Sequence, residues 1–120
     1  MSGLYKIIND RITKLDDSDP DRFTEWEKSR NEWHIKTEID LVSISTVFLG
    51  IDHGFGNTEK PILFETMIFG GKYDGWQRRY STPEEARTGH DTAVKMVRDT
   101  PLWDQIKHTP FENKLITKKS

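Results

Sequence analysis

Two stretches decide the fold of this chain: VSISTVFLGIDHGFG, from Val42 to Gly56, and PILFETMIFGG, from Pro61 to Gly71. Both are rich in β-branched and aromatic residues, which favour strands. Pairing residues whose numbers sum to 112 places like residues opposite each other: Phe48 and Phe64, Thr46 and Thr66, Ile44 and Ile68. Stacking of like side chains across two strands stabilises a sheet face. The two stretches therefore predict an antiparallel hairpin with this register.

This register divides the hairpin into two faces. The predicted core face comprises Ile44, Thr46, Phe48, Ile62, Phe64 and Ile68. The second face comprises Ser43, Ser45, Val47, Leu49, Leu63, Glu65, Met67 and Phe69. It is too apolar to face only water, so we expect the N-terminal helices or a second subunit to cover part of it. On this ground the sequence predicts a homo-oligomer.

The sequence on either side of the hairpin extends the sheet and adds a helix. Alternation after Trp33 predicts an edge strand to Ile39, followed by a turn at residues 40–41, and residues 76–80 predict a fourth strand after a glycine-rich turn. A helix over residues 82–98 is predicted by three agreeing signals: a Thr82 N-cap, Pro83 in the first helical position and Glu85 completing a capping box.

The N-terminal third is predicted to be helical. Leu4, Ile7, Ile8, Ile12 and Leu15 recur at steps of three and four behind Ser2, which indicates an amphipathic helix. Residues 16–20 break it, and a second helix is expected to reach about residue 31. Residues 102–120 predict one further helical turn and a loose basic tail.

The predicted fold class is α+β: a four-stranded antiparallel meander with a C-terminal helix packed on one face, preceded by one or two N-terminal helices. The predicted organisation is a single domain over residues 1–120. Within it, residues 1–32 form a helical N-terminal extension, residues 33–100 the meander with its helix, and residues 101–120 a C-terminal tail.

Composition excludes several function classes. The chain has no cysteine, which excludes disulfides, thiolate catalysis and cysteine-ligated zinc. Its net charge of −2 argues against a general attraction to nucleic acid. No signal peptide and no apolar stretch of about 20 residues is evident, so we expect no membrane association and a soluble, cytoplasmic protein.

Four motifs, STVFLGIDHGFG, LFETMIFGG, QRRYSTPEEA and GH, together resemble a small protein family seen often in bacteriophage and prophage genomes, usually without an assigned function. The resemblance covers roughly residues 42–97, about half the chain, and its motifs are long and ordered. It implies a phage-type accessory protein in the host cytoplasm, acting on a host system. It implies no catalytic mechanism.

Two histidines and two carboxylates suggest a metal site, at which Asp52, His53, Glu65 and His90 would bind Zn²⁺ or Mn²⁺. The register argues against the full set, because Glu65 faces away from Asp52 and lies roughly 13–16 Å from it at ~3.3 Å per residue. Only Asp52, His53 and His90 could then meet, as the centre of a small metal-dependent hydrolase. The alternative for His90 is a hydrogen-bonded histidine at the edge of the core, and for Glu65 an ion pair with Arg78 or Arg79.

The hairpin loop suggests a second kind of site. Gly54 and Gly56 are expected to lie beside the N-terminus of the Thr82 helix, where free amides could bind an anion with help from Arg78 or Arg79. Glu84 and Glu85 oppose this, and the glycines are equally explained by the backbone angles of a hairpin loop.

The leading hypothesis is a non-enzymatic protein that binds a host protein or a small ligand, for example an anion, without a cofactor or metal. The candidate binding residues are Asp52, His53, Gly54, Gly56, Trp76, Arg78, Arg79 and His90.

Overall fold

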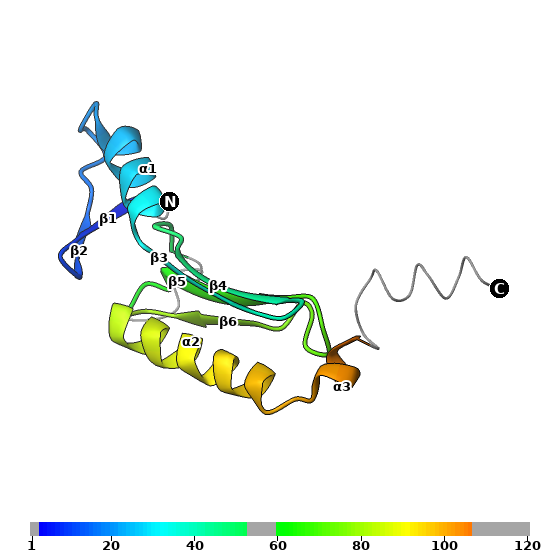
Figure 1. The fold of residues 1–120 in the computed structure, drawn as a ribbon. Coiled ribbons are helices and arrows are strands. Elements are labelled where there is room, and N and C mark those ends of the chain that lie inside the picture. Colours follow the sequence, from blue (N-terminus) through cyan, green and yellow to red (C-terminus); the bar gives the residue numbers. More distant parts are fainter. Residues whose placement is uncertain (1–2, 53–59, 107–120) are drawn as a thin grey trace.

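The structure, a computed structural model, describes residues 3–52 and 60–106 and has an α+β fold. The elements are β1 (Tyr5–Ile8), β2 (Arg11–Lys14), α1 (Arg22–Glu32), β3 (His34–Ile39), β4 (Val42–Phe48), β5 (Phe64–Phe69), β6 (Gln77–Tyr80), α2 (Pro83–Arg98) and α3 (Leu102–Ile106). Strands β3 to β6 form one antiparallel sheet in sequential order, and α2 crosses one of its faces (Figure 1). The predicted meander and its helix are therefore confirmed.

The predicted register of the central hairpin is confirmed. Strands β4 and β5 place Phe48 opposite Phe64, Thr46 opposite Thr66 and Ile44 opposite Ile68. These six side chains are almost completely buried. They lie on the face that α2 covers, so burial against the helix fixes the register: a slip by one residue would turn the whole set toward the other face.

Helix α2 begins as its sequence predicts. The hydroxyl of Thr82 accepts a hydrogen bond from the amide of Glu85, and the Glu85 carboxylate accepts one from the amide of Thr82. Pro83 occupies the first turn, where its missing N–H costs nothing. The helix buries one stripe against the sheet, comprising Pro83, Ala86, Gly89, His90, Ala93 and Val97.

The prediction of an amphipathic helix over residues 4–15 is wrong. These residues form the hairpin β1–β2, which turns at Asn9 and Asp10 with φ of 50° and 64°. Two consecutive residues with positive φ give a type I′ turn, which suits the twist of a two-residue hairpin. The apolar spacing fitted a helix, but Ile7 and Ile12 instead lie opposite each other across the hairpin. Of the two predicted N-terminal helices only the second forms, as α1.

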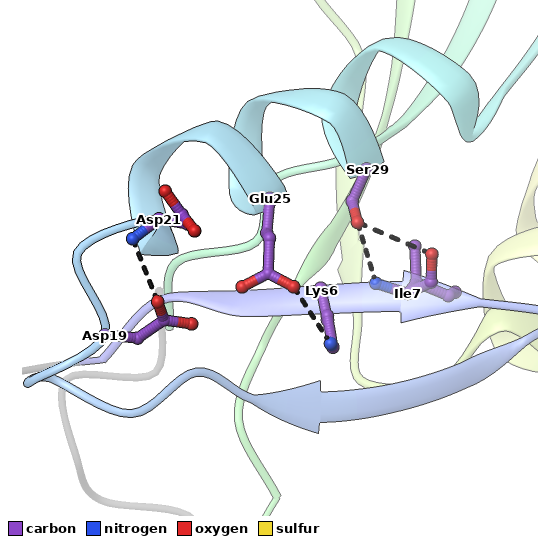
Figure 2. Close-up of polar contacts among 6 residues, drawn as sticks. All are labelled: Lys6, Ile7, Asp19, Asp21, Glu25 and Ser29. Atoms are coloured by element: carbon purple, nitrogen blue, oxygen red, sulfur yellow. Dashed lines mark hydrogen bonds and ion pairs between the residues drawn. The ribbon is translucent and has the colours of Figure 1, made fainter.

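Helix α1 packs on the small hairpin through polar contacts (Figure 2). The buried hydroxyl of Ser29 accepts a hydrogen bond from the amide of Ile7, and the ammonium of Lys6 lies 3.1 Å from the carboxylate of Glu25. The indole N–H of Trp26 donates to the carbonyl of Leu49, at the end of β4. Strands β1 and β2 and helix α1, together the N-terminal unit, are thereby fixed to one end of the main sheet.

The core differs from the prediction at one point. Leu63, assigned to the second face, is fully buried, whereas Ile62, assigned to the core face, is only half-buried. Strand β5 begins at Phe64, after both residues, and the N-terminal unit covers this end of the sheet. Leu63 belongs to the same buried cluster as Ile7 of β1, and this long-range contact explains its burial.

The rest of the second face, which we call the open face, is turned away from α2 (Figure 1). Val47 and Met67 are half-buried, and Phe69 is 49% exposed. Ile7 of the N-terminal hairpin packs in one cluster with Phe48 and Phe64 of the core face, so the expected cover of the second face by N-terminal helices stays a prediction, as does the homo-oligomer. Across residues 3–52 and 60–106, no helix is long and apolar enough to cross a bilayer. The predicted basic tail lies outside the described residues.

Candidate functional site

His90 is a buried histidine with both ring nitrogens hydrogen-bonded. Its Nδ1 lies 2.7 Å from the hydroxyl of Thr46, and its Nε2 lies 2.8 Å from the hydroxyl of Thr37. The Thr46 hydroxyl also bonds that of Thr66, at 2.6 Å. The side chain is 2% exposed and lies between α2 and the sheet. This is the arrangement of a structural histidine.

The protonation of His90 is governed by burial. Desolvation lowers the pKa of its imidazole below the ordinary value of 6.5, and the negative charge of the neighbouring Asp91 opposes this only in part. Threonine hydroxyls can donate or accept, so the hydrogen bonds permit either protonation state. The neutral ring is therefore favoured because charging a buried ring is costly.

Asp52 and His90, the two described members of the predicted metal site with His53, make other contacts. A metal at His90 would have to displace Thr37 or Thr46 from a ring nitrogen. The Asp52 carboxylate accepts a hydrogen bond from the amide of Ile62. No group of three potential ligands occurs within residues 3–52 and 60–106. His53 lies outside these residues.

The two arginines of β6 have different surroundings. Arg79 lies opposite Glu65, and its Nε donates to the Glu65 carboxylate at 2.9 Å, which confirms the predicted ion pair. Both lie on the open face of the sheet. Arg78 lies opposite the buried Thr66 and therefore on the face that carries α2. Its side chain is exposed and forms no ion pair with any residue that the structure describes.

One further candidate residue that the structure describes is Trp76. Trp76 is half-buried and packs against the apolar cluster of Val42, Ile44, Ile68, Ala93 and Val97, so it contributes to the core. Gly54 and Gly56, the predicted anion loop, lie outside the described residues.

A groove runs between β6 and α2. It is open to solvent and has a volume of about 340 Å³, at the lower end of the range of small-ligand sites. Its lining comprises Arg78 and Tyr80 from β6 and Glu84, Glu85, Thr88, Gly89 and Thr92 from α2. The helical residues recur at steps of three and four, so they line one side of α2 over about two turns. Of the candidate binding residues that the structure describes, Arg78 is the one that lines this groove.

The floor of the groove depends on a close approach between Tyr80 and Gly89. A Cβ atom at Gly89 would overlap the ring and the hydroxyl of Tyr80. Glycine is therefore required at this point of the helix, although it weakens a helix interior by about 1 kcal/mol relative to alanine. The Tyr80 hydroxyl is buried and has no hydrogen-bond partner in the described part of the chain. Such groups are rare in native proteins.

Strand β6 also presents a free edge, with which none of the described strands pairs. The carbonyl groups of Trp76 and Tyr80 accept hydrogen bonds from Ile68 and Leu63 on the β5 side. Because successive residues of an antiparallel strand point their backbone groups in opposite directions, those of Gln77 and Arg79 point away from β5. Strand β6 is the last strand of the sheet, and Gln77, Arg78 and Arg79 are all exposed.

Sequence reasoning missed Tyr80, Thr88, Gly89 and Thr92. The small residues at 88, 89 and 92 were a usable signal, since they recur at steps of three and four and so mark a stretch of one side of α2 with small side chains. Comparison with protein-family models, curated proteins and solved structures finds no match to this chain.

Proposed function

We propose that this chain is a non-enzymatic, phage-type accessory protein that works by binding a host partner in the groove between β6 and α2. The observation that carries the proposal is the combination of a free strand edge with an adjoining groove on whose rim Arg78 has no ion pair among the described residues. A binding role requires concave surface with a few convergent polar groups, and this groove supplies both. The phage-type assignment rests on the sequence motifs alone.

The enzymatic alternative, a metal-dependent hydrolase at Asp52, His53 and His90, has weaker support. It requires a histidine nitrogen that can reach a metal, and both nitrogens of His90 already bond threonine hydroxyls. His90 is also 2% exposed, which restricts access by a substrate.

The proposal is tested by site-specific photocrosslinking in a bacterial lysate. A photoreactive phenylalanine analogue replaces Thr88 or Thr92, which line the groove, and in a control protein it replaces Thr24, an exposed threonine of α1. We expect one discrete crosslinked partner from both groove positions and none from Thr24, and we expect Arg78→Glu to abolish the crosslink. Equal crosslinking from all three positions would contradict the proposal.

Metal analysis of the purified chain separates the two classes. We expect no stoichiometric zinc or manganese. A stoichiometric metal that is lost in His90→Ala, but retained in the exposed-site control His34→Ala, would overturn the binding proposal in favour of the hydrolase.

A further inference from the structure

We infer that the ligand of the groove is an extended peptide segment with an acidic side chain, which adds to β6 as a fifth strand of the sheet. The inference rests on the proposed binding function and specifies its ligand. Addition of a strand to a free sheet edge is a general mode of peptide recognition, in which the main chain supplies affinity and alternate side chains supply specificity.

The backbone of β6 has hydrogen-bonding groups that point outward and could pair with a further strand. Gln77 and Arg79 each direct one N–H and one C=O away from β5, because their neighbours Trp76 and Tyr80 bond toward it. A strand beside β6 would lie about 4.8 Å away and could bond all four groups. A compact small molecule would form hydrogen bonds with few of these groups. An extended peptide has N–H and C=O groups at the same spacing and can bond all four.

The groove has the position and length that such a strand requires. Arg78 and Tyr80 point their side chains toward the α2 side of the sheet, so alternate side chains of an added strand would point into the same groove. The helical lining from Glu85 to Thr92 spans about 10 Å at ~1.5 Å per residue, which equals about three residues of extended chain. The Tyr80 ring fills the space beside Gly89, so these two residues form the floor on which an entering side chain would rest.

Charge selects an acidic peptide. The Glu85 carboxylate is engaged by the amides of Ser81 and Thr82, and Arg79 is engaged by Glu65. The pKa of Arg87, on the next turn of α2, is raised mainly by its hydrogen bond with Asp10 and less by the nearby charge of Glu84, so Arg87 is engaged as well. Among the described residues that line the groove, Arg78 is therefore the cation that can meet a ligand carboxylate, and such charge-assisted hydrogen bonds are strong.

The same charges disfavour a second copy of this chain as the added strand. Two β6 strands paired about a twofold axis centred on Arg78 or Arg79 would place equal positive charges directly opposite each other, which destabilises a strand pair. Charged side chains on an edge strand commonly prevent this kind of self-association. An acidic segment from another protein meets no such repulsion.

The test selects short peptides from a displayed random library on the immobilised full chain and measures the affinity of the enriched peptides. We expect a common Asp or Glu, and we expect Arg78→Glu to weaken binding by about tenfold or more. Exchanging the peptide's acidic residue for Lys should restore binding to Arg78→Glu. The control Arg11→Glu changes an exposed arginine of β2, away from the groove, and should leave affinity unchanged.

Two further measurements test strand addition itself. Gln77→Pro removes an outward N–H but no bond to β5, and proline is tolerated at such positions of edge strands, so it should abolish peptide binding. If this variant does not fold, N-methylation of alternate peptide amides provides the same test from the ligand side. In the unmodified protein, bound peptide should slow amide hydrogen exchange at Gln77 and Arg79, but not at Arg78 or Tyr80, whose amides already bond β5.

Absence of any enriched peptide, enrichment without an acidic residue, or binding that survives both Arg78→Glu and Gln77→Pro would overturn the inference. Slow exchange at Gln77 and Arg79 in a dimer without peptide would identify a second copy as the occupant instead. A groove-specific crosslink combined with unaltered exchange at Gln77 and Arg79 would leave the proposed function intact and reject only the fifth strand.

Discussion

Replacement of His90 by alanine tests the buried network beneath α2. The variant loses hydrogen bonds to Thr37 and Thr46, each contributing about 1 kcal/mol. Removal of a fully buried ring leaves a cavity that costs about 1 kcal/mol more. Thr46 keeps its bond to Thr66, and the half-buried Thr37 can bond water, so neither adds a large penalty. We therefore expect the free energy of unfolding to fall by about 3 kcal/mol.

The pH dependence of the unmodified protein follows from the lowered pKa of His90. Above about pH 6.5 the ring is neutral in both the folded and the unfolded chain, so this contribution to stability is constant. Below that pH the unfolded chain binds a proton first, and the free energy of unfolding falls by at most about 1.4 kcal/mol per pH unit. The fall ends below the lower pKa of the folded state, where both states are protonated.

The assay is urea unfolding followed by tryptophan fluorescence, at pH values on either side of 6.5, for the unmodified protein, His90→Ala and the exposed-site control His34→Ala. Carboxylates titrate in all three proteins, so the difference between curves isolates His90. We expect His34→Ala to keep both the stability and the slope. Our reasoning is refuted if His90→Ala keeps full stability, or if the unmodified protein becomes more stable relative to His90→Ala as the pH falls.

Four further predictions concern α2, the groove and the open face. Gly89→Ala should destabilise the chain by about 1–3 kcal/mol in urea unfolding, against the helix preference of alanine, because its Cβ overlaps Tyr80. Tyr80→Phe should leave stability unchanged or slightly higher, because it removes an unpaired buried hydroxyl; a loss above about 1 kcal/mol would reveal a hidden partner. Thr82→Ala should cost about 1 kcal/mol and fray the first turn of α2, seen as faster amide exchange at Glu85. Light scattering at micromolar concentration should find a homo-oligomer that buries the open face around Met67 and Phe69; a strict monomer contradicts it.

The central hairpin and α2 could be predicted because their signals are local and agree with one another. The pairing of Phe48 with Phe64 follows from matching like residues, and the start of α2 follows from Thr82, Pro83 and Glu85 within four positions. The Glu65–Arg79 pair could be anticipated for the same reason, since neighbouring strands of a meander bring such residues opposite each other.

The N-terminal hairpin could not be predicted from apolar spacing, because the same five positions fit a helix. The deciding features were Asn9 and Asp10, which tolerate positive φ, and a contact 22 residues away between Ile7 and Ser29. Such long-range contacts leave no periodic signal in the sequence. The burial of Leu63 was missed for the same reason, since it follows from the position of the N-terminal unit.

At the groove, the residue in α2 differs from the one that a helix interior prefers. A helix interior favours alanine over glycine, yet α2 carries Gly89 at its closest approach to Tyr80. Sequences usually keep each local choice consistent with the fold, and exceptions concentrate at functional sites. A larger residue at 89 would push α2 away from β6, and larger residues at 88 or 92 would fill the groove beside the strand edge. The three small residues therefore keep open the surface on which Arg78 can meet a ligand. The stability lost at Gly89, and at the Tyr80 hydroxyl that no described residue bonds, is located at the proposed site.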